Sequence, residues 1–254
     1  MTSAVVQENV IQFTVLNGRK NTPKLCKDGT KKNTKNNKVS GVSSEVYAFK
    51  SEREINAIVN VLNFKIDNAK TSQKKKDAYR NKLLFLVGMN LGIRASDIRL
   101  LKWSFFFDMV SGEYKMKDYY SLKPVKTAKH GTFVKLFFNQ AIELALNDYI
   151  KIYPIQNIDD YIFQNPSGEP ITVSQMWNII KGTAKEAGIQ QNIGTHSLRK
   201  TWGYWCWHSA EDKQKALITL QKCFSHKDTA TTLKYIGILD TEISDMYNSV
   251  CLGF

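Results

Sequence analysis

The stretch GTHSLRKTWG (residues 194–203) places a histidine and an arginine three residues apart, at His196 and Arg199. In a helix, residues i and i+3 lie on the same face, so these two side chains point to the same side. Such a pair fits a solvated surface, a metal site or a clamp for an anion such as a phosphate. The run WGYWCW that follows is apolar, which predicts that this helix packs against a core.

Three other segments carry side chains of related chemistry. NLGIRASDI places Arg94 after a Gly-Ile step, with Asp97 three residues later to orient its guanidinium. HKDTATTLKYIG places Tyr235 nine residues after His226, and Lys126 lies in the polar segment PVKTAKHG. Each residue alone has an ordinary structural explanation, a surface ion pair for the arginine and packing for the tyrosine. The order Arg, Lys, His-x-x-Arg, His, Tyr is difficult to obtain by chance.

Metal and nucleotide sites find little support in the sequence. His196, Cys206, His208, Cys223 and His226 are numerous enough for a zinc site, but none falls in HExxH or CxxC spacing. The P-loop and GxGxxG patterns are absent, so ATP and dinucleotides lack their phosphate cradle. We therefore predict neither a metal nor a cofactor.

The net charge favours a polyanionic partner. The chain has 36 Lys+Arg against 23 Asp+Glu, a formal charge of +13. Such a field attracts DNA or RNA, although a basic solvated surface gives the same count. There is no run of 18 apolar residues for a membrane span, and the N-terminus does not read as a secretory leader. Four cysteines without paired spacing suit a reducing cytosol, so we expect a cytoplasmic protein with no membrane partner.

The composition of the chain changes near residue 45. Residues 1–45 are polar and rich in Lys and Asn, which predicts a flexible basic arm. Residues 46–254 read as one globular domain, ending in an amphipathic tail helix at about 240–250.

Helical patterns dominate this domain. Capping boxes, Ser51 with Glu54 and Thr172 with Gln175, begin two of the expected helices. The β-prone runs EYKMKDYYSLK and TFVKLFF predict a hairpin with a cationic turn. The expected fold class is α+β, mostly helical with a small antiparallel β-sheet.

These motifs resemble those of the tyrosine recombinase (phage integrase) family, over roughly residues 46–248. LGIRASDIRLLKW resembles the family's first-arginine box, THSLRKTWG its H-x-L-R-[HK]-[ST] box, and FSHKDTATTLKYIG its L-G-H-x8-Y closing box. VKTAKHGTFVKLF resembles the hairpin that carries the family's lysine. Phe224-Ser225 departs from the family's usual Leu-Gly. We also expect the helical core-binding domain that normally precedes the catalytic domain to be absent or truncated.

The resemblance implies a site-specific recombinase or integrase that cuts and rejoins DNA through a 3′-phosphotyrosine, without metal or ATP. It implies these roles: Tyr235 as nucleophile, Arg94 and Arg199 as phosphate clamp, His196 as acceptor of the tyrosine proton, His226 as a hydrogen-bonding partner of the phosphate, Lys126 as general acid and Asp97 as a supporting residue. Lys123 and Lys129 are alternative general acids. A topoisomerase IB-like relaxing activity and a non-catalytic DNA-binding accessory protein are the alternative functions.

The expected partner is double-stranded DNA. Further contacts to its backbone are expected from four lysines, Lys123, Lys129, Lys200 and Lys227. The family resemblance implies a homotetramer on DNA during synapsis, a monomer in free solution and an accessory DNA-bending protein. It also implies a bacterial or phage-encoded protein involved in genome integration or a mobile element.

Overall fold

The computed structural model describes residues 45–126 and 133–250. Within these ranges the protein is mostly helical with small antiparallel sheets, which confirms the predicted fold class. The arm at 1–44 and Lys129 lie outside the described residues. The division between an arm and a catalytic domain therefore stays a prediction.

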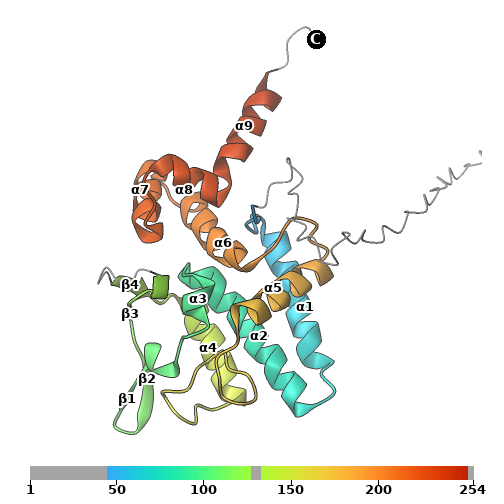
Figure 1. The fold of residues 1–254 in the computed structure, drawn as a ribbon, viewed down its shortest axis with the longest axis vertical. Helices are drawn as coiled ribbons and strands as arrows, with labels where there is room; N and C mark the ends of the chain where they lie inside the picture. The colour runs from blue at the N-terminus through green and yellow to red at the C-terminus, as the bar shows by residue number, and fades with distance from the viewer. Residues whose placement is uncertain (1–44, 127–132, 251–254) are drawn as a thin grey trace, which may run out of the picture. The chain divides into compact units, whose positions relative to one another are not determined.

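Helices supply most of the framework (Figure 1). They are α1 (Glu52–Asp67), α2 (Ser72–Leu91), α3 (Ala95–Ile98), α4 (Gln140–Ile152), α5 (Val173–Glu186), α6 (Thr195–His208), α7 (Lys213–Phe224), α8 (Thr229–Ile236) and α9 (Ile238–Ser249), with a 3-10 helix η1 (Trp103–Phe105). Both predicted capping boxes are present, at the start of α1 and of α5. None of the helices in the described ranges is long and apolar enough to cross a membrane.

The β-structure differs in part from the prediction. The run EYKMKDYYSLK is divided between two hairpins rather than forming one strand. Its first part, β2 (Glu113–Met116), pairs with β1 (Phe107–Val110), and its second part, β3 (Tyr119–Leu122), pairs with β4 (Val134–Phe137). The predicted hairpin with TFVKLFF is thus the β3–β4 pair.

The break between β2 and β3 has a local cause. The Lys117 backbone N–H donates to Phe106 O at 2.8 Å, and the Lys117 ammonium donates to Ser104 O at 2.7 Å. Both contacts hold Lys117 at the end of η1. The chain therefore leaves the β1–β2 pair at Lys117 before it enters the β3–β4 pair. Strand β1 carries no alternating pattern, since only Phe107 of its residues is buried.

The core consists of three hydrophobic clusters. The first joins α2, α4 and the β3–β4 hairpin, and the second joins α1 and α5 to one face of α2 and α6. The third lies between α6, α7 and α8, with Leu220, Phe224 and Ile236 at its centre. Gly203 of α6 faces this cluster, where an added Cβ would lie 2.6 Å from the Phe224 ring. The WGYWCW run also contributes Trp202, Tyr204 and Trp207, as predicted for a helix packed on a core.

Candidate active site

The first arginine lies at the junction of α2 and α3. Gly92 ends α2 in a left-handed conformation (φ 63°), and Arg94 is the residue directly before α3. Asp97 is almost fully buried, 3% exposed, and its carboxylate accepts a 2.8 Å hydrogen bond from Val125 N–H. Asp97 therefore joins α3 to the segment after β3 that carries Lys126, and its expected orientation of the Arg94 guanidinium stays a prediction.

The second arginine is buried and held on two sides. Arg199 is 7% exposed and donates from Nη1 to Gly92 O at 2.6 Å. Its guanidinium carbon lies 4.5 Å from the centroid of the Phe224 ring. Burial lowers the pKa of Arg199. The helix α6 thus brings Arg199 to the turn that precedes Arg94.

Tyr235 lies in the same site as the two arginines of its own chain. Its hydroxyl lies 3.4 Å from Nδ1 of His196. Burial raises the pKa of Tyr235, and the charge of Arg199 with a hydrogen bond from its guanidinium opposes that rise. The tyrosine is therefore protonated at neutral pH and already directed at two polar partners.

His196 is adapted to accept a proton. Its pKa is lowered below 6.5 by partial burial and by the charges of Arg199, Lys200, Arg94 and Lys126. A neutral imidazole at neutral pH has one ring nitrogen free to accept. Because Nδ1 faces the Tyr235 hydroxyl, this ring is placed to take the tyrosine proton.

His226 is oriented by a residue that the sequence motif did not identify. Its Nδ1 lies 3.1 Å from Oγ1 of the buried Thr232, and its ring centroid lies 5.1 Å from that of Tyr235. Partial burial and the charge of Arg199 lower the pKa of His226. With Nδ1 engaged by the threonine, Nε2 is the nitrogen left for a ligand.

Phe224 and Ser225, which replace the usual Leu-Gly of the closing box, each have a clear structural consequence. Ser225 ends α7 in a left-handed conformation (φ 58°), which glycine adopts at no steric cost. Phe224 packs at once on Arg199, on Trp202 and on the rings of His226 and Tyr235. The larger side chain therefore forms an apolar contact between Arg199 and Tyr235.

Lys200 has a different position from the predicted DNA-backbone contact. Its side chain is only 6% exposed and its ammonium forms a 2.6 Å ion pair with Glu45. The ammonium also lies 5.1 Å from the centroid of the Tyr235 ring. A buried, paired lysine does not face a phosphate backbone, so Lys200 is better described as a charge beside the nucleophile.

The other predicted lysines are found at the surface. Lys123, Lys126 and Lys227 are exposed, and Lys227 lies 3.7 Å from Asp228. The charge of Lys126 reaches the site, since it contributes to the lowered pKa of His196. Their predicted roles in catalysis and DNA binding remain predictions.

The segment at residues 45–50 supports the site, and no motif in the sequence indicated it. Lys50 donates from its ammonium to Gly237 O, at the end of α8, at 2.7 Å. Phe49 N–H donates to Thr201 Oγ1 at 2.9 Å, and the Trp205 indole donates to Phe49 O at 3.0 Å. This segment therefore fixes both α6 and the helix that carries Tyr235.

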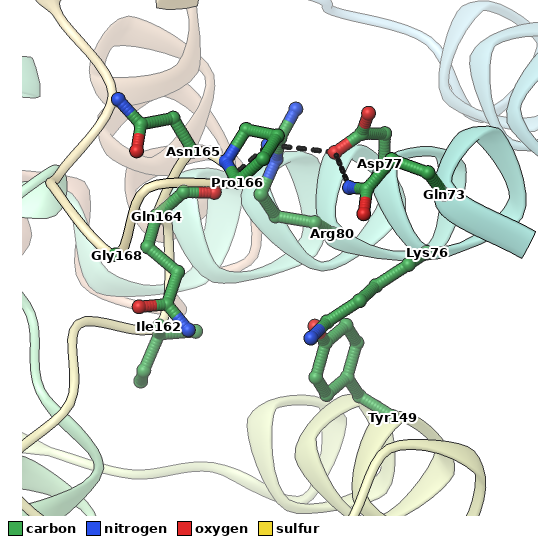
Figure 2. Close-up of a pocket in the computed structure, with 10 residues that line it drawn as sticks. All are labelled: Gln73, Lys76, Asp77, Arg80, Tyr149, Ile162, Gln164, Asn165, Pro166 and Gly168. Carbon is green, nitrogen blue, oxygen red and sulfur yellow. Dashed lines mark hydrogen bonds and ion pairs between the residues drawn. The ribbon is translucent and has the colours of Figure 1, made fainter.

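A cavity of about 550 Å³ opens beside the arginines. It is lined by Arg94, Asp97 and Arg199, and also by Lys135 and Phe137 of β4. A smaller cavity of about 140 Å³ lies between α2, α4 and residues 162–168 (Figure 2). There Arg80 is held by Asp77 and by Gln164 O, both at 2.9 Å, so its guanidinium is already occupied.

The fold is that of the catalytic domain of tyrosine recombinases. XerA recombinase has a TM-score of 0.56 at 19% identity, over 84% of this chain and 66% of that chain. XerH bound to palindromic difH DNA has a TM-score of 0.53 at 21% identity, over 76% of this chain and 50% of that chain.

Sequence comparison identifies the family. A family model described as "Phage integrase family" matches residues 52–242. The probable integrase/recombinase YoeC of Bacillus subtilis is 28% identical over 63% of this chain and 78% of that protein. Tyrosine recombinase XerD of Listeria monocytogenes is 32% identical over 35% of this chain and 29% of that protein. The chain belongs to the phage integrase family.

The similarity is confined to part of several relatives. The chain spans about half the length of XerH, and its match with XerD covers less than a third of that protein. The fold and the family follow from these comparisons. The residues that carry the reaction, the DNA substrate and the assembly are matters of proposal.

Proposed function

We propose that this protein cleaves and rejoins DNA strands in site-specific recombination, with Tyr235 as the nucleophile. The observation that carries the proposal is the position of the Tyr235 hydroxyl, which lies 3.4 Å from Nδ1 of His196. The charge of the buried Arg199 also acts on this hydroxyl, so a proton acceptor and a phosphate-binding cation lie at the same site. This arrangement is expected of an activated nucleophile.

In the cleavage step, the Tyr235 oxygen forms a bond to phosphorus and the bond to the 5′ oxygen breaks. His196 takes the phenol proton, and Lys126 donates a proton to the departing 5′ oxygen. The product is a 3′-phosphotyrosine and a free 5′-hydroxyl. The reverse step with the 5′-hydroxyl of another strand restores the phosphodiester, so no external energy source is consumed.

The arginines stabilise the charge that gathers on the non-bridging phosphate oxygens. Guanidinium groups bind phosphate through paired N–H donors, which lysine lacks. Arg199 is preorganised because Gly92 O and Phe224 fix its plane. Removing one such preorganised donor typically slows the chemical step about 10²–10³-fold.

The test is the formation of a covalent protein–DNA adduct. Nicked suicide duplexes that tile the DNA flanking the gene trap the phosphotyrosine, because the released 5′ end diffuses away. The wild-type protein is expected to form an adduct that Tyr235→Phe abolishes and that the exposed-residue control Tyr114→Phe leaves unchanged. An adduct that survives Tyr235→Phe would overturn the assignment.

Assembly on DNA is proposed to involve the last helix. In α9 and its C-cap, Met246, Tyr247 and Val250 are 70%, 81% and 62% exposed. Apolar side chains this exposed fit contact with a neighbouring subunit. The assembly we propose is a homotetramer on double-stranded DNA in the cytoplasm. Sedimentation of a Met246→Ser, Tyr247→Ser variant with DNA is expected to show smaller complexes than the wild type.

A further inference from the structure

The β3–β4 hairpin has an outward face of unusual composition. The cross-strand pairs are Tyr119 with Phe137 and Ser121 with Lys135, and Phe133 precedes β4. Tyr119, Phe133 and Phe137 are 46%, 62% and 66% exposed. Because side chains alternate along a strand, residues 133, 135 and 137 share one face. We call the outward side chains of Tyr119, Phe133, Lys135 and Phe137 the aromatic face.

The opposite face of the same hairpin explains why these rings are outside. Leu122 and Leu136 are buried, and the Tyr120 ring stacks on Phe105 with centroids 3.6 Å apart. One side of the hairpin therefore already packs on the core. The fold does not require apolar side chains on its other side. The aromatic face has no structural role in the fold that accounts for its exposure.

The charge of the aromatic face and its position beside the two arginines indicate which ligand binds to it. Neither β3 nor β4 contains an acidic residue, and the Lys135 ammonium lies 3.6 Å from the Tyr119 ring centroid and 5.1 Å from that of Phe137. Lys135 and Phe137 also line the cavity that contains Arg94 and Arg199. Aromatic rings interspersed with cations form the stacking surfaces that bind unpaired bases. Protein–protein interfaces, in contrast, are depleted of lysine.

We propose that the aromatic face stacks on unpaired bases of the DNA strand beside the scissile phosphate. This inference rests on the proposed strand exchange, in which the strand bearing the free 5′-hydroxyl leaves its duplex before it is rejoined. Its bases are exposed during that transfer. A surface that borders the phosphate site holds them close to the reacting atoms.

The experiment measures binding without cleavage, in the Tyr235→Phe background. Fluorescence anisotropy compares a labelled oligothymidylate with a labelled duplex of equal length. Stacking of one base on an aromatic side chain is worth about 1–3 kcal/mol, so Phe137→Ala is expected to weaken oligothymidylate binding about 5- to 100-fold. Duplex affinity is expected to stay within about twofold, because backbone contacts are retained.

Phe64 supplies a matched control, since it is also 66% exposed but lies on α1. Phe64→Ala is expected to change neither affinity, and Phe137→Trp to retain oligothymidylate binding. Thermal unfolding of each variant establishes that the hairpin is folded. The proposal is overturned if Phe137→Ala has no effect or weakens both ligands equally. It is also overturned if the substitution instead removes concentration-dependent self-association, because a second copy would then occupy the face.

This result is independent of the adduct assay. A protein that forms no phosphotyrosine but loses oligothymidylate binding on Phe137→Ala contradicts the cleavage proposal alone. Adduct formation with unchanged oligothymidylate binding contradicts the stacking proposal alone.

Discussion

Arg199 Nη1 lies 2.6 Å from the carbonyl oxygen of Gly92, although the two residues are 107 positions apart in the chain. Gly92 ends α2, and the next turn carries Arg94. One hydrogen bond thus sets the position of Arg199 relative to Arg94. The geometry of the phosphate site depends on a backbone atom that no side-chain motif describes.

Gly92→Ala is expected to damage both stability and catalysis. The residue has φ 63°, and an added Cβ would lie 2.2 Å from the Trp202 ring. The left-handed conformation costs about 1–2 kcal/mol and the overpacking about 1–3 kcal/mol. Chemical denaturation is expected to show a loss of about 2–5 kcal/mol in the free energy of unfolding, and adduct formation to slow because Arg199 is displaced.

Gly188→Ala is the control for Gly92. Gly188 has φ 77°, but nothing lies within 4 Å of the position that an added Cβ would take. Only the conformational cost of about 1–2 kcal/mol is expected, with no change in adduct formation. Equal effects of the two substitutions would contradict a specific role for the Gly92–Trp202 contact.

Ser225→Gly is expected to stabilise the protein. Ser225 has a positive φ of 58° at the end of α7, where glycine is free of steric cost. A gain of about 1 kcal/mol is expected, which corresponds to a rise of about 2–4 °C in Tm for a chain of this size. Ser209→Gly, at a C-cap with φ −84°, is expected to give no gain. Differential scanning calorimetry measures both.

The rate of adduct formation is expected to fall in acid. In the proposed cleavage step the neutral form of His196 accepts the tyrosine proton, and its pKa is lowered below 6.5. Protonation of His196 therefore removes the proton acceptor only at a pH below the ordinary pKa of histidine. The rate of adduct formation is expected to be constant from there up to neutral pH. Single-turnover measurements across pH define this acid limb.

Lys200→Met is expected to move the acid limb to higher pH. The charge of Lys200 is among those that lower the pKa of His196, so its removal raises that pKa. Lys227→Met, which removes an exposed charge outside this set, is expected to leave the limb in place. If Lys200→Met does not shift the pH profile of adduct formation, Lys200 has a packing role only.

Lys126 is expected to be identified by chemical rescue. Lys126→Ala should slow cleavage about 10²–10⁴-fold, the usual contribution of a general acid. With a 5′-bridging phosphorothiolate the leaving group is a thiolate that needs no proton, so the variant should approach the wild-type rate. Lys123→Ala is expected to show neither the defect nor the rescue. Rescue of Lys129→Ala in place of Lys126→Ala would transfer the role to Lys129.

The features of the fold and of the site that can be predicted from the sequence are those that depend on residues within one short segment. The capping boxes at Ser51 and Thr172, and the spacing from His226 to Tyr235, each lie within one short segment. Side-chain hydrogen bonds at a helix start are local interactions, so a few residues are enough to predict them. The fold class and the family can be predicted from such segments.

Other features depend on contacts between distant segments. Lys200 reads as a basic residue next to the second arginine, but its burial results from Glu45, 155 positions away. The division of EYKMKDYYSLK follows from the contacts of Lys117 with η1. Neither contact has a local sequence pattern, and tertiary context decides strand pairing more than propensity does.

Gly203 and Phe224 share one volume. The missing side chain on α6 leaves the space that the enlarged ring on α7 occupies, and Ile236 of the nucleophile helix closes it from the third side, 2.9 Å from the position of an added Cβ. Alanine at 203 therefore requires both the Phe224 ring and Ile236 to move, because both would lie less than 3.0 Å from its Cβ. Redesign of this region has to treat the two positions as a single unit, because a change at one sets the permitted size at the other.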